Sequence, residues 1–168
     1  MVKLLIQMKR IFVKMLEWTV IILVAVLVLD VLWGVFSRYV LGAQSRWTEE
    51  LAVMLLIWVS LLGAAVAFAA KAHLGVDYFV GKLDPAAQKL MEGVVYVIVF
   101  FFAAYALIYG GGVLVSKTLS SGQVSPAMGL KVGHMYLAVP ISGVFICLFA
   151  LEQMLELILP GKMKREET

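Results

Sequence analysis

One carboxylate of the 168-residue chain, that of Asp30, lies inside a long run of apolar residues. A carboxylate at membrane depth is costly, so Asp30 is expected to face protein or water rather than lipid. Arg38 follows eight residues later, on roughly the same face of a helix. This spacing favours an ion pair or hydrogen bond from Asp30 to a neighbouring helix or to a partner subunit. A proton or cation site is the alternative, although no second acid lies nearby in the sequence.

Two further acids, Glu49 and Glu50, stand directly before the second apolar run. Carboxylates in the first turn of a helix meet the positive end of its dipole, which is the simplest explanation of the pair. The alternative is a docking point for a soluble partner or a second subunit outside the membrane.

The residue types that carry most catalysis are scarce. The two histidines, His73 and His134, fall at opposite membrane surfaces in the topology derived below, so they cannot ligate one haem iron. Cys147 is the single cysteine, which excludes an internal disulfide and dithiol redox chemistry. The sequence shows no His/Cys/Asp spacing typical of a metal site, no serine triad pattern and no phosphate-binding glycine loop. We therefore expect no enzyme, no cofactor and no metal site.

The composition indicates what kind of elements must position these residues. Hydrophobic residues make up 63% of the chain and charged residues 15%, with a mean hydropathy of +1.00. A soluble domain averages roughly 45–50% apolar and about 25% charged residues, so much of this chain must use the bilayer as its solvent. The length has room for about four spans of roughly 20 residues. The predicted fold class is an all-α integral membrane protein that forms a single membrane domain over residues 1–168.

Capping and breaking residues divide the apolar sequence into spans. Ser45 or Thr48 can cap the second helix, and Asp84-Pro85 is typical of a helix start. The glycines at 110–112 fall at the end of the third apolar run, and Pro140 lies in the first turns of the fourth, where a missing N–H costs little. The first run is longer than the apolar core of a signal peptide, so we expect it to be retained. The four predicted spans are residues 18–36, 51–70, 93–109 and 135–159.

Two amphipathic stretches, residues 2–16 and 71–83, accompany these spans. Each has apolar residues at helical spacing on one side and charged residues on the other, which is typical of helices that lie at the membrane surface. Residues 2–16 could instead extend the first span into water. The basic residues expected to meet lipid headgroups are Lys3, Arg10, Lys14, Lys71 and Lys82.

Lysine and arginine are distributed unequally between the two sides of this topology. The N-terminal segment, the second connection and the C-terminal tail carry ten of them, whereas the first and third connections carry four. Because basic residues concentrate in cytoplasmic loops, both termini of this multi-pass chain are predicted to be cytoplasmic. The basic residues flank apolar runs and form no stripe, so nucleic acid is not an expected partner.

The centres of the predicted spans are smooth and apolar. Carriers usually hold a polar solute near the bilayer midplane, where broken helices expose backbone dipoles. Here the glycine and proline breaks fall mostly at the span ends, which favours a structural or partner-binding role. The alternative is a self-sufficient small transporter or channel that oligomerises around Asp30.

Several short motifs give the sequence a family resemblance. They are Arg38-Tyr39-Val40-Leu41-Gly42, Trp47-Thr48-Glu49-Glu50-Leu51-Ala52, Trp58, Gly63-Ala64-Ala65 and His73-Leu74-Gly75-Val76-Asp77, followed by Tyr136, Pro140 and Gly143 in the last span. In this order they resemble the small membrane subunit, of the DctQ type, of tripartite ATP-independent periplasmic (TRAP) transporters. The resemblance covers nearly the whole chain in order and topology, but Asp30 is not part of the pattern.

The resemblance implies a non-catalytic scaffold subunit in the bacterial inner membrane. A separate, larger membrane subunit of the M type would carry substrate and sodium ions by an elevator-type motion. A periplasmic binding protein, the P subunit, would deliver an organic acid such as a C4-dicarboxylate or sialic acid. The residues expected at subunit or docking interfaces are Asp30, Arg38, Arg46, Trp47, Glu49, Glu50, Trp58, His73 and Asp77.

Overall fold

The computed structural model describes residues 2–43, 45–70 and 84–158, with the side chains of residues 2–9, 85 and 86 left out. Within this part the regular secondary structure is helical, apart from one isolated β-bridge between Val124 and Lys131. The helices are α1 (Val2–Tyr39), α2 (Arg46–Ala69), α4 (Pro85–Phe102), the π-helix η1 (Ala103–Gly110), α5 (Gly111–Ser120), α6 (Gly133–Tyr136) and α7 (Ala138–Ile158).

Four helical stretches of the described residues are long and apolar enough to cross a membrane. They are Arg10–Tyr39, Arg46–Ala69, Ala87–Ser120 and Gly133–Ile158. The third joins α4, η1 and α5 into one rod, and the fourth joins α6 to α7. This architecture confirms the predicted all-α membrane fold with four long apolar helices.

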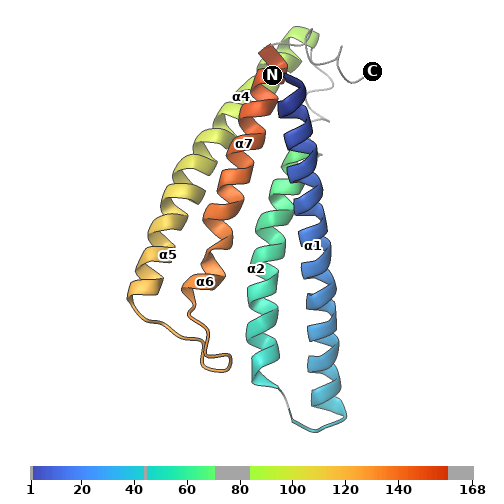
Figure 1. Ribbon diagram of the computed structural model, residues 1–168, viewed down its shortest axis with the longest axis vertical. Coiled ribbons are helices and arrows are strands. Elements are labelled where there is room, and N and C mark those ends of the chain that lie inside the picture. Colours follow the sequence, from blue (N-terminus) through green and yellow to red (C-terminus); the bar gives the residue numbers. More distant parts are fainter. Residues whose placement is uncertain (1, 44, 71–83, 159–168) are drawn as a thin grey trace.

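The long helices lie side by side in a row, in the order α1, α2, α7 and the α4–η1–α5 rod (Figure 1). α2 contacts α1 on one side and α7 on the other, and α7 in turn contacts α4 and η1. The start of α1 and the end of α7 lie at the same end of the molecule, as an even number of spans requires. α1 and the α4–η1–α5 rod therefore form the two edges of the row.

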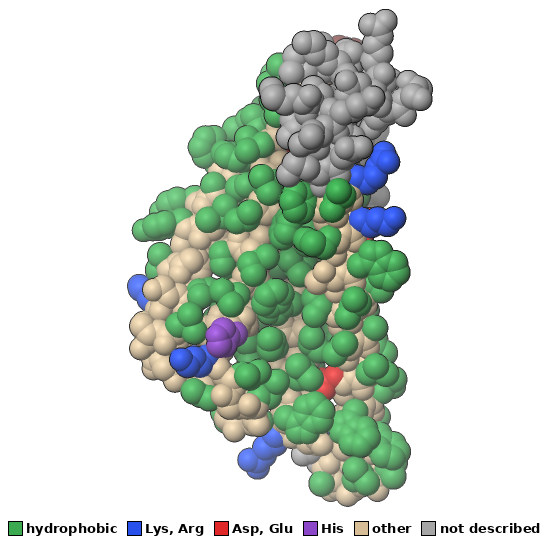
Figure 2. Space-filling view, viewed as in Figure 1, with side chains coloured by type: hydrophobic (Ala, Val, Ile, Leu, Met, Phe, Trp, Pro, Cys, Tyr) green, Lys and Arg blue, Asp and Glu red, His purple; other side chains and the backbone are tan. Residues whose placement is uncertain are grey.

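Small residues lie where the helices approach most closely. Ala65 of α2, Ala103 of η1 and Ala150 of α7 are fully buried in one continuous apolar core. Small side chains let helix backbones come together, which drives packing in lipid, where burying apolar surface gains little. The outward surface of the row is covered by large apolar side chains, with Lys and Arg toward the ends (Figure 2). The fold is thus arranged for an apolar solvent.

Local sequence determines several helix ends. Ser45 is the N-cap residue of α2, and Asp84 is the N-cap residue of α4, with Pro85 in its first turn. Both positions agree with the prediction, but neither side chain makes a capping hydrogen bond. By contrast, α1 runs unbroken from Val2 to Tyr39, so residues 2–16 are its first turns and not a separate helix. Their position at the membrane surface stays a prediction, and the predicted arm at 71–83 lies outside the described residues.

The third helix continues past its predicted end. The sequence places that end near Tyr109, whereas the chain stays helical through the glycines at 110–112 and on to Ser120. In an apolar environment the backbone has no water to bond with, so glycine does not readily end a helix. Gly111 and Gly143 also have a packing role. A Cβ on Gly111 would lie 2.8 Å from Val139 Cγ1, and one on Gly143 would lie 2.7 Å from Leu107 Cβ.

Residues 121–132, which join α5 to α6, fold into a compact turn. The Ser125 N–H donates to the Leu130 carbonyl at 2.8 Å, and the Val132 N–H donates to the Gln123 carbonyl at 3.0 Å. Gly129 adopts a φ of 67°, a left-handed conformation that favours glycine. The turn lies at the same end of the molecule as the α1–α2 connection (Figure 1). We call this end, opposite the start of α1, the loop end.

Candidate functional site

The end of α1 and the start of α2 are joined by an ion pair. Arg38 lies in the last turn of α1, and its Nη2 is 3.6 Å from Oε1 of Glu49, which lies in the first turn of α2. The two side chains are 55% and 64% exposed, so the pair is worth about 1 kcal/mol or less by itself. The structure thus brings together two of the predicted interface residues, and they pair within the chain.

Glu50 holds the 121–132 turn against α2. Its carboxylate accepts a hydrogen bond from the Ser125 hydroxyl and from the backbone N–H groups of Ala127 and Met128, at 3.1–3.2 Å for the two amides. Bonds to an ionised acceptor are stronger than neutral ones, and here three donors converge on one carboxylate. Glu50 therefore connects the start of α2 to the 121–132 turn, a contact that its place at a helix start does not reveal.

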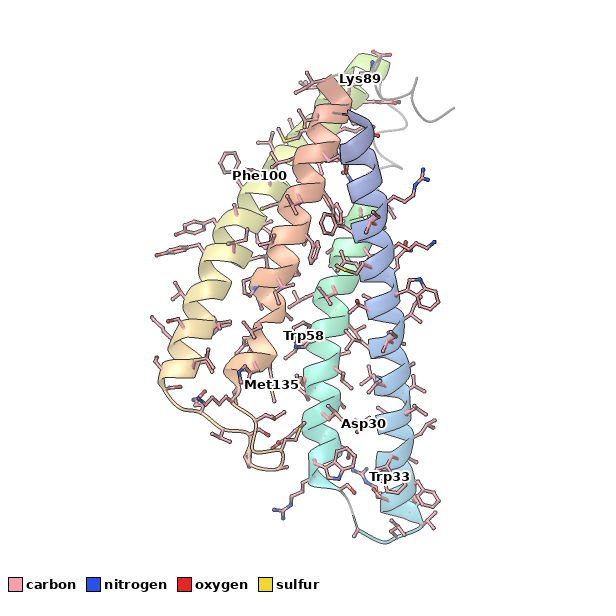
Figure 3. The ribbon with its side chains drawn as sticks, viewed as in Figure 1. Asp30, Trp33, Trp58, Lys89, Phe100 and Met135 are labelled. Atoms are coloured by element: carbon pink, nitrogen blue, oxygen red, sulfur yellow. The ribbon has the colours of Figure 1, made fainter. Side chains whose placement is uncertain are left out.

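Asp30 lies between α1 and α2 (Figure 3), eight residues before Arg38 and so about two helical turns from it along α1. Its side chain is only 6% exposed, and neither carboxylate oxygen has a hydrogen-bond partner among the described residues. Arg38 lines the same cavity but pairs with Glu49. The neighbouring helix α2, which the sequence suggested as a partner for Asp30, thus supplies no hydrogen-bond donor among the described residues. Contact of Asp30 with a partner subunit stays a prediction.

The cavity beside Asp30 has a volume of about 180 Å³. Its walls are the facing sides of α1 and α2, which approach closely at Gly34, where an added Cβ would lie 3.3 Å from Thr48 Oγ1. The residues that line it are Asp30, Val31, Gly34, Val35, Arg38, Tyr39, Thr48, Glu49 and Ala52. The Thr48 hydroxyl donates to the Ser45 carbonyl at 2.6 Å, which leaves its oxygen lone pairs to the cavity side.

The remaining predicted interface residues are spread over the molecule. Arg46 and Trp47 are exposed at the start of α2, close to the Arg38–Glu49 pair. Trp58 packs against the apolar core in the middle of α2, and its indole N–H is buried without an acceptor among the described residues. Figure 3 shows it between α2 and the α6–α7 helix. His73 and Asp77 lie outside the described residues.

The predicted lipid contacts are described only in part. Arg10 and Lys14 are exposed on α1, where basic side chains can reach headgroups. Lys71 and Lys82 lie outside the described residues, as does the side chain of Lys3. Lys89 is found at the opposite edge, beside an apolar cavity of about 390 Å³ between α4 and α7.

Gln153 is a structural residue that sequence reasoning missed. Its side chain is 1% exposed, and its amide Nε2 donates to the Phe68 carbonyl at 2.9 Å, which joins α7 to the last turn of α2. The available signal was an amide within a predicted span, because a polar group at that depth needs a protein partner.

The described residues offer binding and pairing, and they show no arrangement typical of catalysis. Within the described ranges, no three His, Cys, Asp or Glu side chains lie close enough to hold a metal ion. The charged groups gather at the loop end, where Arg38, Glu49 and Glu50 connect α1, α2 and the 121–132 turn. Asp30 is the acid of this end that the chain itself leaves without a partner among the described residues.

Comparison with known proteins identifies the family. The family described as "Tripartite ATP-independent periplasmic transporters, DctQ component" matches residues 26–159. A TRAP transporter small permease protein of Haemophilus influenzae is 28% identical over 145 residues, which are 86% of this chain and 88% of that protein. The sialic acid TRAP transporter small permease protein SiaQ of Vibrio cholerae is 26% identical over 136 residues, covering 81% and 77% of the two chains.

A more distant relative is the C4-dicarboxylate TRAP transporter small permease protein DctQ of Rhodobacter capsulatus. It is 26% identical over 111 residues, which are 63% of this chain and 46% of that protein. The family match includes the end of α1, the two acids Glu49 and Glu50, the α4–η1–α5 rod and the whole of the last span. The chain therefore belongs to the DctQ family, the small membrane component of TRAP transporters.

Proposed function

We propose that this chain is a non-catalytic scaffold that binds the large, M-type membrane subunit of a TRAP transporter. The observation that carries the proposal is the exposure of apolar surface along the row of helices. Only 6% of the most apolar stretch of α1 is buried, and α1 packs mainly on α2. A helix row of this kind offers long faces for another membrane protein and encloses no polar path along the described residues. The moving, substrate-carrying domain then belongs to the partner.

The names of the relatives support this assembly. The permease protein DctMQ of Oleidesulfovibrio alaskensis, an isethionate TRAP transporter, is 29% identical over 101 residues, and the matched segment is only 16% of that protein. A small component within a much larger permease chain is what a scaffold attached to an M subunit would look like. We extend the same assembly of a small and a large component to this chain.

The proposed transporter takes up an organic acid together with sodium ions, and a periplasmic binding protein delivers the acid. Relatives named for sialic acid and for C4-dicarboxylates support the organic-acid class. The loop end, where Arg46 and Trp47 are exposed beside the Arg38–Glu49 pair, is the proposed periplasmic surface. The residues there are candidates for contact with the delivery protein or with the M subunit.

The proposed orientation places both termini in the cytoplasm and the chain in the bacterial inner membrane. The excess of Lys and Arg on the terminal side supports this orientation. Arg10 and Lys14, together with the lysines predicted at 3, 71 and 82, would then contact anionic lipid headgroups on the cytoplasmic side. Such contacts would hold the scaffold still while the partner's transport domain moves.

Reconstitution in liposomes tests the proposed function. We expect no organic-acid uptake from this chain alone, and sodium-dependent uptake when it is combined with the M subunit and the binding protein of the same organism. Uptake by this chain alone, lost in an Asp30→Asn variant that still inserts, would instead support the self-sufficient oligomeric transporter. Full uptake by the M subunit and binding protein without this chain would show that the scaffold role is wrong.

A further inference from the structure

The cavity beside Asp30 lies within the membrane-spanning part of α1. Asp30 precedes Arg38 by eight residues, which is about 12 Å along a helix at roughly 1.5 Å per residue. Its carboxylate is therefore below the loop-end surface, at a depth where an ionised group needs a partner or water. The exposed α1 residues around it, Val31, Leu32 and Trp33 among them, are apolar. Asp30 is thus a single acidic group recessed in an apolar face.

The charges that line the cavity do not balance. Asp30 and Glu49 are acids and Arg38 is a base, and Arg38 is paired with Glu49 at 3.6 Å. The carboxylate of Asp30 has no hydrogen-bond donor among the described residues. The cavity as a whole therefore has an excess of one negative charge, which is complementary to one positive charge.

The shape of the cavity favours a side chain over a bare ion. A volume of about 180 Å³ is that of about six water molecules at roughly 30 Å³ each, far more than one metal ion fills. The described residues show no cluster of three acids or histidines that would coordinate such an ion. The ring of Tyr39, the side chain of Val35 and the stem of Arg38 give the cavity an apolar wall. The long apolar stem and charged end of a lysine or arginine fit both the wall and the carboxylate.

We propose that the Asp30 cavity is a socket for one lysine or arginine side chain of the large membrane subunit, which enters between α1 and α2. This inference rests on the proposed function, because it assigns the face of the scaffold that the partner contacts. Desolvation offsets much of the attraction of a buried charge pair, but a buried charge left without its partner is costly. The socket therefore gives register and specificity to an otherwise apolar interface. α1 provides the apolar surface, and Asp30 fixes where the partner sits on it.

Co-purification tests the socket. The M subunit of the same organism, carrying an affinity tag, is co-expressed with the wild-type chain or with a variant, and the ratio of the two chains is measured after purification in mild detergent. We expect the retained amount of this chain to fall at least five-fold for Asp30→Asn, and to stay within two-fold of the wild type for Asp30→Glu, which keeps the charge. Glu92→Gln, the same chemical change on the exposed side of α4, is the matched control and should change nothing.

Two further measurements show whether a loss of co-purification comes from the socket contact or from a less stable chain. The melting temperature of the isolated Asp30→Asn chain should equal or exceed that of the wild type, because Asp30 makes no hydrogen bond within the described chain. A lower melting temperature would assign Asp30 to the stability of this chain and overturn the proposal. Neutralising each lysine and arginine of the M subunit in turn should identify one whose removal weakens the complex, with no further loss when it is combined with Asp30→Asn.

The outcomes of these experiments distinguish the socket at Asp30 from the scaffold role of the whole chain. If the wild-type chain co-purifies with the M subunit and Asp30→Asn does so equally well, the socket is wrong and the scaffold role stands. If Asp30→Asn weakens the complex but no basic residue of the M subunit is coupled to it, the partner of the Asp30 carboxylate is water, an ion or a lipid, and the proposal is again wrong. If the wild-type chain does not bind the M subunit at all, both proposals fail together.

Discussion

Three carboxylates within one region of the chain have three different environments. Asp30 is buried without a donor among the described residues, Glu49 is exposed in an ion pair, and Glu50 accepts three hydrogen bonds from a distant turn. The sequence identified all three as significant, because acids beside or inside apolar runs need an explanation. It could not reveal the role of Glu50, since its partners lie 75 to 78 residues away and are brought near by the packing of α2 beside α6. Short-range spacing does not predict such contacts.

Substitution of Glu50 should cost more stability than substitution of its neighbour. Glu50→Gln turns three charge-assisted bonds into ordinary or missing ones, so we expect the free energy of unfolding to fall by about 1–2 kcal/mol. Glu49→Gln removes an exposed ion pair and should cost about 0–1 kcal/mol. Unfolding of the purified chain in detergent micelles measures both. Equal losses from the two variants would mean that the 121–132 turn is not held through Glu50.

Gln153 provides a second test at the scale of single residues. Gln153→Glu replaces the donor to the Phe68 carbonyl by an acceptor, and it places a buried negative charge beside the negative end of the α2 dipole. We expect a loss of about 3–5 kcal/mol of stability, or a failure to accumulate in the membrane. Gln123→Glu makes the same change on the exposed turn and should stay within about 0.5 kcal/mol of the wild type. A stable Gln153→Glu chain would show that the α2–α7 hydrogen bond contributes little.

The elements were predictable where a local residue determines them. Ser45 and Asp84 start α2 and α4 as N-cap residues because the reason, a backbone conformation that precedes a helix, is local. The continuation of the third helix through Gly110–Gly112 was not predicted, since glycine breaks helices in water and not in lipid. The π-helical segment Ala103–Gly110 also has no signal in the sequence. This segment, η1, packs on α7, a contact that spacing within the segment does not reveal.

Close packing of η1 on α7 depends on Gly143. A methyl group there would lie 2.7 Å from Leu107 Cβ and 3.2 Å from the Ile108 backbone nitrogen, so Gly143→Ala must push the helices apart. We expect the chain to lose about 1–3 kcal/mol of stability, measured by its unfolding in micelles. Gly112→Ala is the matched control, because its methyl group meets nothing within 4 Å, and it should be neutral or stabilising by up to about 1 kcal/mol. Destabilisation by both variants alike would point to glycine flexibility instead of close contact.

At the scale of the molecule, hydropathy predicted the number of spans but not which spans pack against each other. Each long helix exposes apolar residues over much of its surface, so amphipathicity does not indicate which face packs inward. The order α1, α2, α7 and α4–η1–α5 depends instead on small residues such as Ala65 and Ala150, and on polar links such as Gln153 to Phe68. A row with two open edges is a reasonable shape for a protein whose remaining contacts belong to a partner. Because hydropathy does not distinguish the packed face of a helix from its exposed face, a surface for a partner was equally hard to predict.

The orientation of the row of helices in the membrane can be tested by labelling introduced cysteines, because the native Cys147 should not react. Cys147 is buried in α7 and should not react with a membrane-impermeant maleimide in the folded chain. The exposed turn carries Gln123, and a Gln123→Cys variant should label in intact spheroplasts, because the positive-inside rule places this turn in the periplasm. A Thr168→Cys variant should label only after the membrane is permeabilised, because the ten basic residues of the terminal side hold the tail in the cytoplasm. The reverse labelling pattern would place the Arg38–Glu49 pair and the Asp30 cavity on the cytoplasmic side, where no periplasmic binding protein could reach them.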